Sequence, residues 1–255
     1  MNRTTFTSRR AGRYVHLALS LNVALAIAGG ATAALADANN GPTSHYVEDA
    51  KNYLAKGELK AAEIQLKNAL RDNPNDLDAR ITMGIVSMRE GDAGGAERSF
   101  KVALQQSGTR PQVLPLLGQS YLMQGKAREI IDEMKPDGLP PESAAQIADL
   151  RSRAYISQKD PVNARKEAET ALSLQPEMPD ALLTLAFLRR LDGDAAGAEL
   201  LVDRALKINP QSALVLNAKG ELRASQGDPT GALDMFKKAA AARPDDVNAR
   251  LGEVS

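Results

Sequence analysis

Few residues in this chain of 255 residues are of the types that usually carry out catalysis or bind metals. Cysteine is absent, and the two histidines are His16 and His45. A catalytic triad needs a histidine beside a nucleophile and an acid, and a zinc site needs three or four nitrogen, sulfur or carboxylate ligands. His16 lies in an apolar N-terminal segment, and His45 stands at the start of a predicted helix without a plausible partner. We therefore predict no catalytic residue, no metal site and no cofactor.

One glycine-containing segment, Gly118 to Gly125, is followed by a lysine, Lys126, as in phosphate-binding loops. A P-loop requires a shorter glycine spacing and a serine or threonine after the lysine, where this chain has Ala127. A P-loop also joins a strand to a helix, whereas this segment has the pattern of a helix and its turn. Carboxylates are plentiful, but solvated helix faces and the first turns of helices account for them. The sequence therefore predicts a protein that is not an enzyme.

From Ser44 onward, small residues, glycines and prolines recur with a spacing of 34 residues. Two columns hold alanine, one holds glycine and one holds proline. The first alanine column comprises Ala62, Ala96, Ala164, Ala198 and Ala232, the second Ala69, Ala103, Ala171, Ala205 and Ala239, the glycine column Gly57, Gly91, Gly125, Gly193 and Gly227, and the proline column Pro74, Pro176, Pro210 and Pro244.

Each column has a physical explanation in a repeated pair of antiparallel helices. Alanine allows two helices to cross closely, because a larger side chain would force them apart. Glycine ends the first helix in a left-handed conformation, and proline after the second helix prevents its continuation. A single pair cannot bury its apolar face, so stability must come from stacking on neighbouring pairs. The pattern predicts an all-α solenoid.

A helix–turn–helix unit of this length with these columns resembles the tetratricopeptide repeat. The resemblance implies a right-handed superhelical solenoid over residues 43–255, with six 34-residue units and a truncated seventh. The units are expected to begin near Thr43, Leu77, Pro111, Ala145, Pro179 and Ala213, and the truncated one at Val247. The third unit departs from the pattern, because prolines follow Met134 closely and break up its second helix.

The N-terminal residues have the order of a secretory signal peptide. Four arginines precede an apolar run from Val15 to about Ala28, and small residues lead to a cleavage site after Ala36. We therefore predict a signal peptide at 1–36, a flexible leader at 37–42 and an exported protein of the periplasm or cell envelope. The alternative is an uncleaved N-terminal membrane anchor. Cleavage would leave 28 basic and 32 acidic residues, a net charge of −4. The remaining chain has no stripe of basic residues that would favour binding to nucleic acid.

The resemblance also implies a binding surface, because the first helix of each tetratricopeptide unit lines the concave side of the array. The candidate partner-binding residues on that side are Ile81, Ile85, Met88, Gln119, Leu122, Arg153, Ile156, Leu183, Phe187 and Arg190. Much of this stripe is apolar, as is common for a protein–protein site. The alternative is that individual members fill space between neighbouring helix pairs. A lysine–asparagine clamp for a peptide carboxylate is not evident, because Ile81, Thr82 and Ile85 occupy the positions where polar residues would be needed.

A narrower resemblance covers residues 53–84 and 113–141, which are similar to the start of exported tetratricopeptide proteins of the PEP-CTERM, or exosortase, sorting system. This resemblance implies a role in exopolysaccharide production or envelope sorting. We therefore predict a non-catalytic scaffold that binds a peptide or helix of a partner protein in the envelope, with no nucleic acid and no small-molecule substrate. The alternatives are a general periplasmic or outer-membrane assembly scaffold, and a module that self-associates through its C-terminal hairpin.

Overall fold

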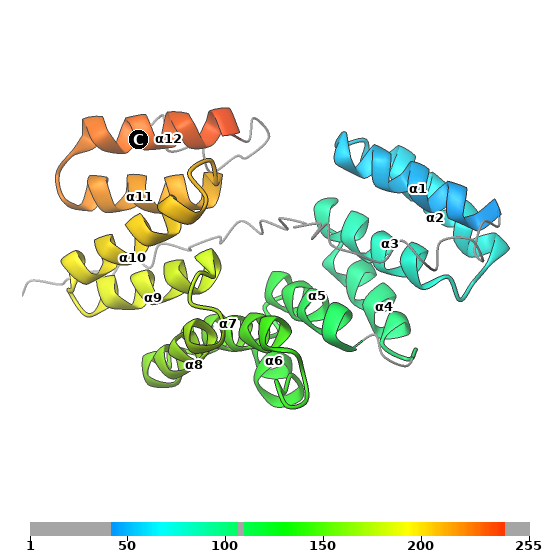
Figure 1. Cartoon of the computed structure of the whole chain (residues 1–255), viewed down its shortest axis with the longest axis horizontal. Helices are drawn as coiled ribbons and strands as arrows, with labels where there is room; N and C mark the ends of the chain where they lie inside the picture. The colour runs from blue at the N-terminus through cyan, green and yellow to red at the C-terminus, as the bar shows by residue number, and fades with distance from the viewer. Residues whose placement is uncertain (1–41, 107–109, 243–255) are drawn as a thin grey trace, which may run out of the picture.

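A computed structural model describes residues 42–106 and 110–242, which form twelve α-helices and no strand (Figure 1). The predicted all-α fold class is thereby confirmed. The predicted signal peptide, the leader up to residue 41 and the truncated seventh unit lie outside the described residues. The helices are α1 (Pro42–Ala55), α2 (Leu59–Asp72), α3 (Leu77–Arg89), α4 (Ala93–Ala103), α5 (Arg110–Met123), α6 (Ala127–Glu133), α7 (Pro141–Ser157), α8 (Pro161–Leu174), α9 (Pro179–Leu191), α10 (Ala195–Ile208), α11 (Ala213–Ser225) and α12 (Pro229–Ala242).

Consecutive helices pair into hairpins, and the hairpins stack in chain order. Each second helix packs on its own first helix and, apart from α12, the last described helix, also on the first helix of the next hairpin. Figure 1 shows the hairpins following one another along an arc, with α1–α2 and α11–α12 at its two ends. One hydrophobic cluster runs from α1 to α7, and smaller clusters join α7 to α12.

The alanine columns lie where the helices of a hairpin cross. Nine of these ten alanines are 0 % exposed and the tenth, Ala232, is 4 % exposed, so the close approach leaves no room for a larger side chain. The five column glycines have φ between 69° and 83°, the left-handed region that glycine adopts without a steric penalty. In the fourth hairpin this position is Lys159, which adopts the same conformation at φ 61°.

Ion pairs join successive hairpins and help to fix their register. Glu97 of α4 accepts hydrogen bonds from Lys101, at 2.7 Å, and from Lys126 of the next hairpin, at 2.6 Å. Burial alone would raise the pKa of Glu97, but the hydrogen bonds from Lys101 and Lys126 lower it to about 2. Between the fourth and fifth hairpins the two charges change places. The second helix α8 supplies the cation, Arg165, and it pairs with the carboxylate of Asp192, which follows α9.

The third hairpin is irregular in the way that its prolines predict. Its second helix, α6, has 7 residues, and the chain then runs through an irregular segment to Pro141. Two arginines bond the carbonyl groups that a longer helix would have satisfied. Arg151 of α7 donates to the carbonyl oxygens of Ile131 and Met134 at 2.7 and 3.2 Å, and Arg110 donates to those of Lys135 and Asp137. These arginines hold the irregular segment against α5 and α7.

Candidate functional site

The first helices of the hairpins form the inner, concave face of the arc. The helices α1, α3, α5, α7, α9 and α11 contact one another in succession, whereas no two second helices are in contact within residues 42–106 and 110–242. Elements on the inner side of a curved array approach one another more closely than those on its outer side. All ten predicted partner-binding residues belong to α3, α5, α7 and α9.

The apolar part of the predicted stripe is less exposed than the sequence suggested. Ile85 and Met88 of α3 are 6 % and 4 % exposed and belong to the hydrophobic core. Ile81 and Leu122 are half-buried against the same cluster, and Ile156 and Leu183 pack on two of the smaller clusters. Ile85 and Met88 therefore fill space between hairpins and present little surface to a partner. The remaining predicted residues, Gln119, Arg153, Phe187 and Arg190, are half-buried on the concave face.

A cluster of polar side chains joins α7 to α9 and was not predicted from the sequence. Asp149 is 2 % exposed, accepts a hydrogen bond from Thr184 Oγ1 at 2.8 Å and lies 3.8 Å from the guanidinium of Arg153. Burial raises the pKa of Asp149, and the positive charge of Arg153 opposes this rise. Asp180 lies nearby in the first turn of α9. Burial and the charge of Asp149 raise the pKa of Asp180 to about 6, against the opposing effect of Arg153.

Asp180 should make the stability of the protein depend on pH. Its folded-state pKa of about 6 lies above the ordinary value of 3.8, so its contribution to stability is greatest at low pH and is lost as the pH rises through 6. We expect Asp180→Asn to raise the free energy of unfolding at pH 7.5 by about 1–2 kcal/mol, and by less than half of that at pH 4.5. Urea unfolding of both proteins at the two pH values measures this difference. A difference that does not change with pH would contradict the assignment to Asp180.

Further along the concave face, two amide side chains have oxygen atoms without hydrogen-bond donors. Oε1 of Gln119 on α5 and Oδ1 of Asn217 on α11 are both inaccessible to solvent and accept no hydrogen bond. Asn217 as a whole is 9 % exposed. Between them on α9, the guanidinium of Arg190 lies 5.5 Å from the ring of Phe187, and its charge acts on Glu221 of α11. The concave face of α5 to α11 therefore combines an aromatic ring with charged groups.

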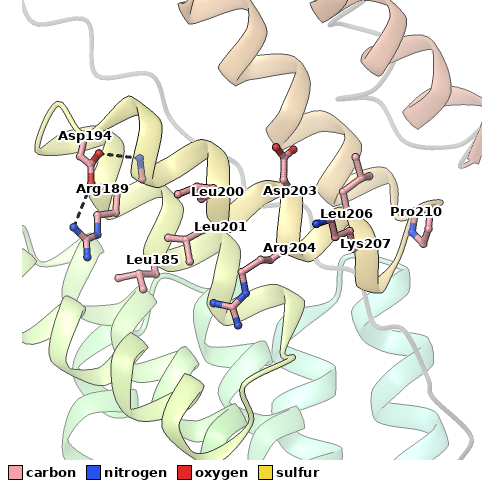
Figure 2. Close-up of a pocket in the computed structure, with 11 residues that line it drawn as sticks. Leu185, Arg189, Asp194, Leu200, Leu201, Asp203, Arg204, Leu206, Lys207 and Pro210 are labelled. Carbon is pink, nitrogen blue, oxygen red and sulfur yellow. Dashed lines mark hydrogen bonds and ion pairs between the residues drawn. The ribbon is translucent and has the colours of Figure 1, made fainter.

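A hollow lies elsewhere, beside α10 (Figure 2). It has a volume of about 880 Å³ and its apolar lining includes Leu185, Leu201 and Leu200, which is 68 % exposed. Four of the charged groups that line it have partners. Asp194 pairs with Arg189 at 3.2 Å, as Figure 2 shows, and caps α10 through the N–H of Gly197. Arg204 donates to the carbonyl oxygen of Pro176, and Asp203 pairs with Lys219. This hollow therefore offers a partner mainly apolar contact.

Residues 42–106 and 110–242 contain no group of three or more histidine, cysteine or carboxylate side chains placed to hold a metal ion. None of the helices in these ranges combines the length and the hydropathy of a membrane span.

Comparison with known proteins places the chain among repeat proteins. A family model described as "Tetratricopeptide repeat" matches residues 155–222. Cellulose synthase 1 operon protein C of Komagataeibacter xylinus is 27 % identical over 186 residues, which are 72 % of this chain and 12 % of that protein. Type IV pilus assembly protein PilF of Pseudomonas aeruginosa is 25 % identical over 146 residues, 56 % of this chain and 58 % of PilF. The chain therefore spans a small part of its cellulose-operon relative and just over half of PilF.

Solved structures share the fold at low sequence identity. The structure of Pseudomonas aeruginosa PilF has a TM-score of 0.57 at 20 % identity and covers 83 % of this chain and 96 % of its own. PilW, described as a widely conserved type IV pilus biogenesis factor, has a TM-score of 0.61 at 16 % identity and covers 83 % of this chain and 98 % of its own. At these identities the likeness concerns the fold alone.

Proposed function

We propose that this solenoid of helix hairpins is a non-catalytic scaffold that holds a segment of a partner protein against its concave face, which the match of residues 155–222 to the tetratricopeptide repeat supports. The observation that carries this proposal is the set of side chains on α5 to α11. There, the half-buried side chains of Phe187 and Arg190 present an aromatic and a charged surface. Aromatic and arginine side chains are the types that most often anchor a partner protein.

The setting that we propose is exopolysaccharide production at the cell envelope. The similarity to cellulose synthase operon protein C supports this choice, as does the predicted export of the chain. A role in assembly of type IV pili is a second candidate, supported by the similarity to PilF. The PEP-CTERM sorting role implied by the narrower resemblance stays a hypothesis, and so does self-association through the C-terminal hairpin.

Affinity capture from an envelope extract tests the proposal. Wild-type protein, a concave-face variant, Phe187→Ser, and a matched outer-face variant, Leu200→Ser, are immobilised in parallel, and the retained proteins are identified by mass spectrometry. We expect wild type and Leu200→Ser to retain the same partner, and Phe187→Ser to retain less than about a tenth of it, because loss of an aromatic anchor commonly costs 1.4 kcal/mol or more.

Two results would count against the proposal. If Phe187→Ser retains the partner as well as wild type does, the concave face does not bind it. If all three proteins retain only copies of themselves, the chain is an assembly module that self-associates. Circular dichroism of the three proteins checks that the helical content is unchanged.

A further inference from the structure

On the concave face, the carboxylate of Asp180 in α9 lacks a partner. It makes no hydrogen bond and no ion pair with any residue in the described ranges. Thr184 Oγ1 lies 3.0 Å from the backbone oxygen of Asp180 and does not bond its side chain. A ligand that satisfies this carboxylate must supply N–H donors.

The charges around Asp180 define the ligand further. The side chains of α7 that act on it are Asp149 and Arg153. Arg153 lies 3.8 Å from Asp149, so its single positive charge is shared between two carboxylates. Thr184 is neutral, and its hydroxyl already donates a hydrogen bond to Asp149. One negative charge is therefore left uncompensated at a half-buried site, where an opposite charge has a greater effect than in bulk water.

The neighbouring part of α9 suits a side chain with an apolar stem. Phe187 follows Asp180 by seven residues, or about 10 Å along the helix, on the same face. An extended peptide covers this distance in about three residues. Arg190 and Glu221 have opposite charges and act on each other, so they add no net charge beside the ring. A segment that crosses this face therefore meets an uncompensated carboxylate and, about three residues away, an aromatic surface.

We propose that the partner segment carries a lysine or arginine whose cationic group binds the carboxylate of Asp180, with an apolar residue about three positions away that packs on Phe187. This inference rests on the proposed function and names the chemistry of the partner. A segment with an acidic side chain or a free carboxylate at this place is repelled by Asp180 and Asp149.

Selection from a random library of 12-residue peptides displayed on phage tests the inference at pH 7.5. The purified protein, Asp180→Asn and a matched control, Asp234→Asn, are used side by side. Asp234 is an exposed carboxylate of α12 that pairs with Lys238. We expect peptides selected by wild type and Asp234→Asn to be enriched in lysine or arginine, and those selected by Asp180→Asn to lose this enrichment.

The selected peptide is then synthesised with its basic residue and with norleucine in its place, and binding is measured by fluorescence anisotropy. We expect about a tenfold loss of affinity from Asp180→Asn, about the same loss from norleucine and no further loss when both changes are combined, as for two groups that bind each other. Asp180→Asn removes a buried charge, so it is not expected to unfold the protein, and urea unfolding verifies this.

The outcomes separate this inference from the proposed function. Two results would refute the claim that a lysine or arginine of the partner binds Asp180. They are selection by wild type of peptides without basic residues, and binding of the basic peptide by Asp180→Asn as well as by wild type. In either case the scaffold proposal stands. If wild type enriches no peptide above a selection performed without protein, both proposals fail.

Discussion

Replacement of Arg151 by methionine is expected to lower the free energy of unfolding by about 3–5 kcal/mol. The Arg151 guanidinium lies 2.8 Å from Glu167, and the two side chains are only 12 % and 18 % exposed. The same guanidinium donates to the carbonyl oxygens of Ile131 and Met134, at the C-terminal end of the shortened helix α6. Methionine keeps the apolar stem but leaves a buried carboxylate and two carbonyl groups without donors. Loss of such partners is among the most costly changes that a single substitution makes.

The position of Arg151 in the array adds a second expectation. The third and fourth hairpins meet through α5, α6 and α7, and Arg151 of α7 bonds to carbonyl groups at the end of α6 across this junction. In repeat arrays, a weakened interface can uncouple the units on either side. Urea unfolding of Arg151→Met should therefore show a broader or two-step transition, with hydrogen exchange accelerated first in α6. Arg128→Met, at an exposed position of α6, is the control. A change below about 1 kcal/mol in Arg151→Met, as for exposed ion pairs, would contradict this account.

Replacement of Ile85 by aspartate is expected to destabilise the protein by about 3–5 kcal/mol. Ile85 is 6 % exposed within the largest hydrophobic cluster, where an ionised carboxylate would have no donor or cation beside it. Leu191→Asp, at a position that is 62 % exposed near the end of α9, introduces the same charge and should change stability by less than about 0.5 kcal/mol. Thermal unfolding followed by circular dichroism compares the two. Equal stability of Ile85→Asp and wild type would show that Ile85 is exposed after all.

The burial of Ile85 also determines which substitutions are suitable for testing the concave face. A charged residue at Ile85 or Met88 would weaken partner binding by unfolding the second hairpin, even if neither side chain touches a partner. Substitutions at Phe187 and Asp180, which are only partly buried, leave the core intact. Loss of binding in those variants can therefore be assigned to the concave face itself.

The repeated features could be predicted because each depends on one helix pair. Alanine at a helix crossing and glycine at a left-handed turn are local requirements, so they recur at a fixed spacing and are visible in the sequence. The shortened helix α6 was predicted for the same reason, since proline acts on its own helix. The left-handed conformation of Lys159 was not predicted, because it breaks the glycine column and is imposed by the hairpin around it.

The features of the concave face depended on contacts between hairpins and were less predictable. The rotation of a helix about its axis decides whether Ile85 points into the core or into the groove, and sequence patterns do not fix this rotation to within one residue. Asp149 and Thr184 are 35 residues apart and meet only because α7 and α9 stack. The sequence contains both residues but no sign that they bond, and Asp180 gains its raised pKa only from this packing.

Site-specific photo-crosslinking in the native envelope tests the central claim most directly. A photoreactive phenylalanine analogue is placed at Phe187 on the concave face in one protein and at Leu200 on the outer face in another. Crosslinked products are then identified by mass spectrometry. Our account predicts that the probe at Phe187 captures another protein through a segment that contains lysine or arginine, and that the probe at Leu200 does not capture it. Capture of the partner from Leu200 alone would contradict the assignment of the binding surface to the concave face.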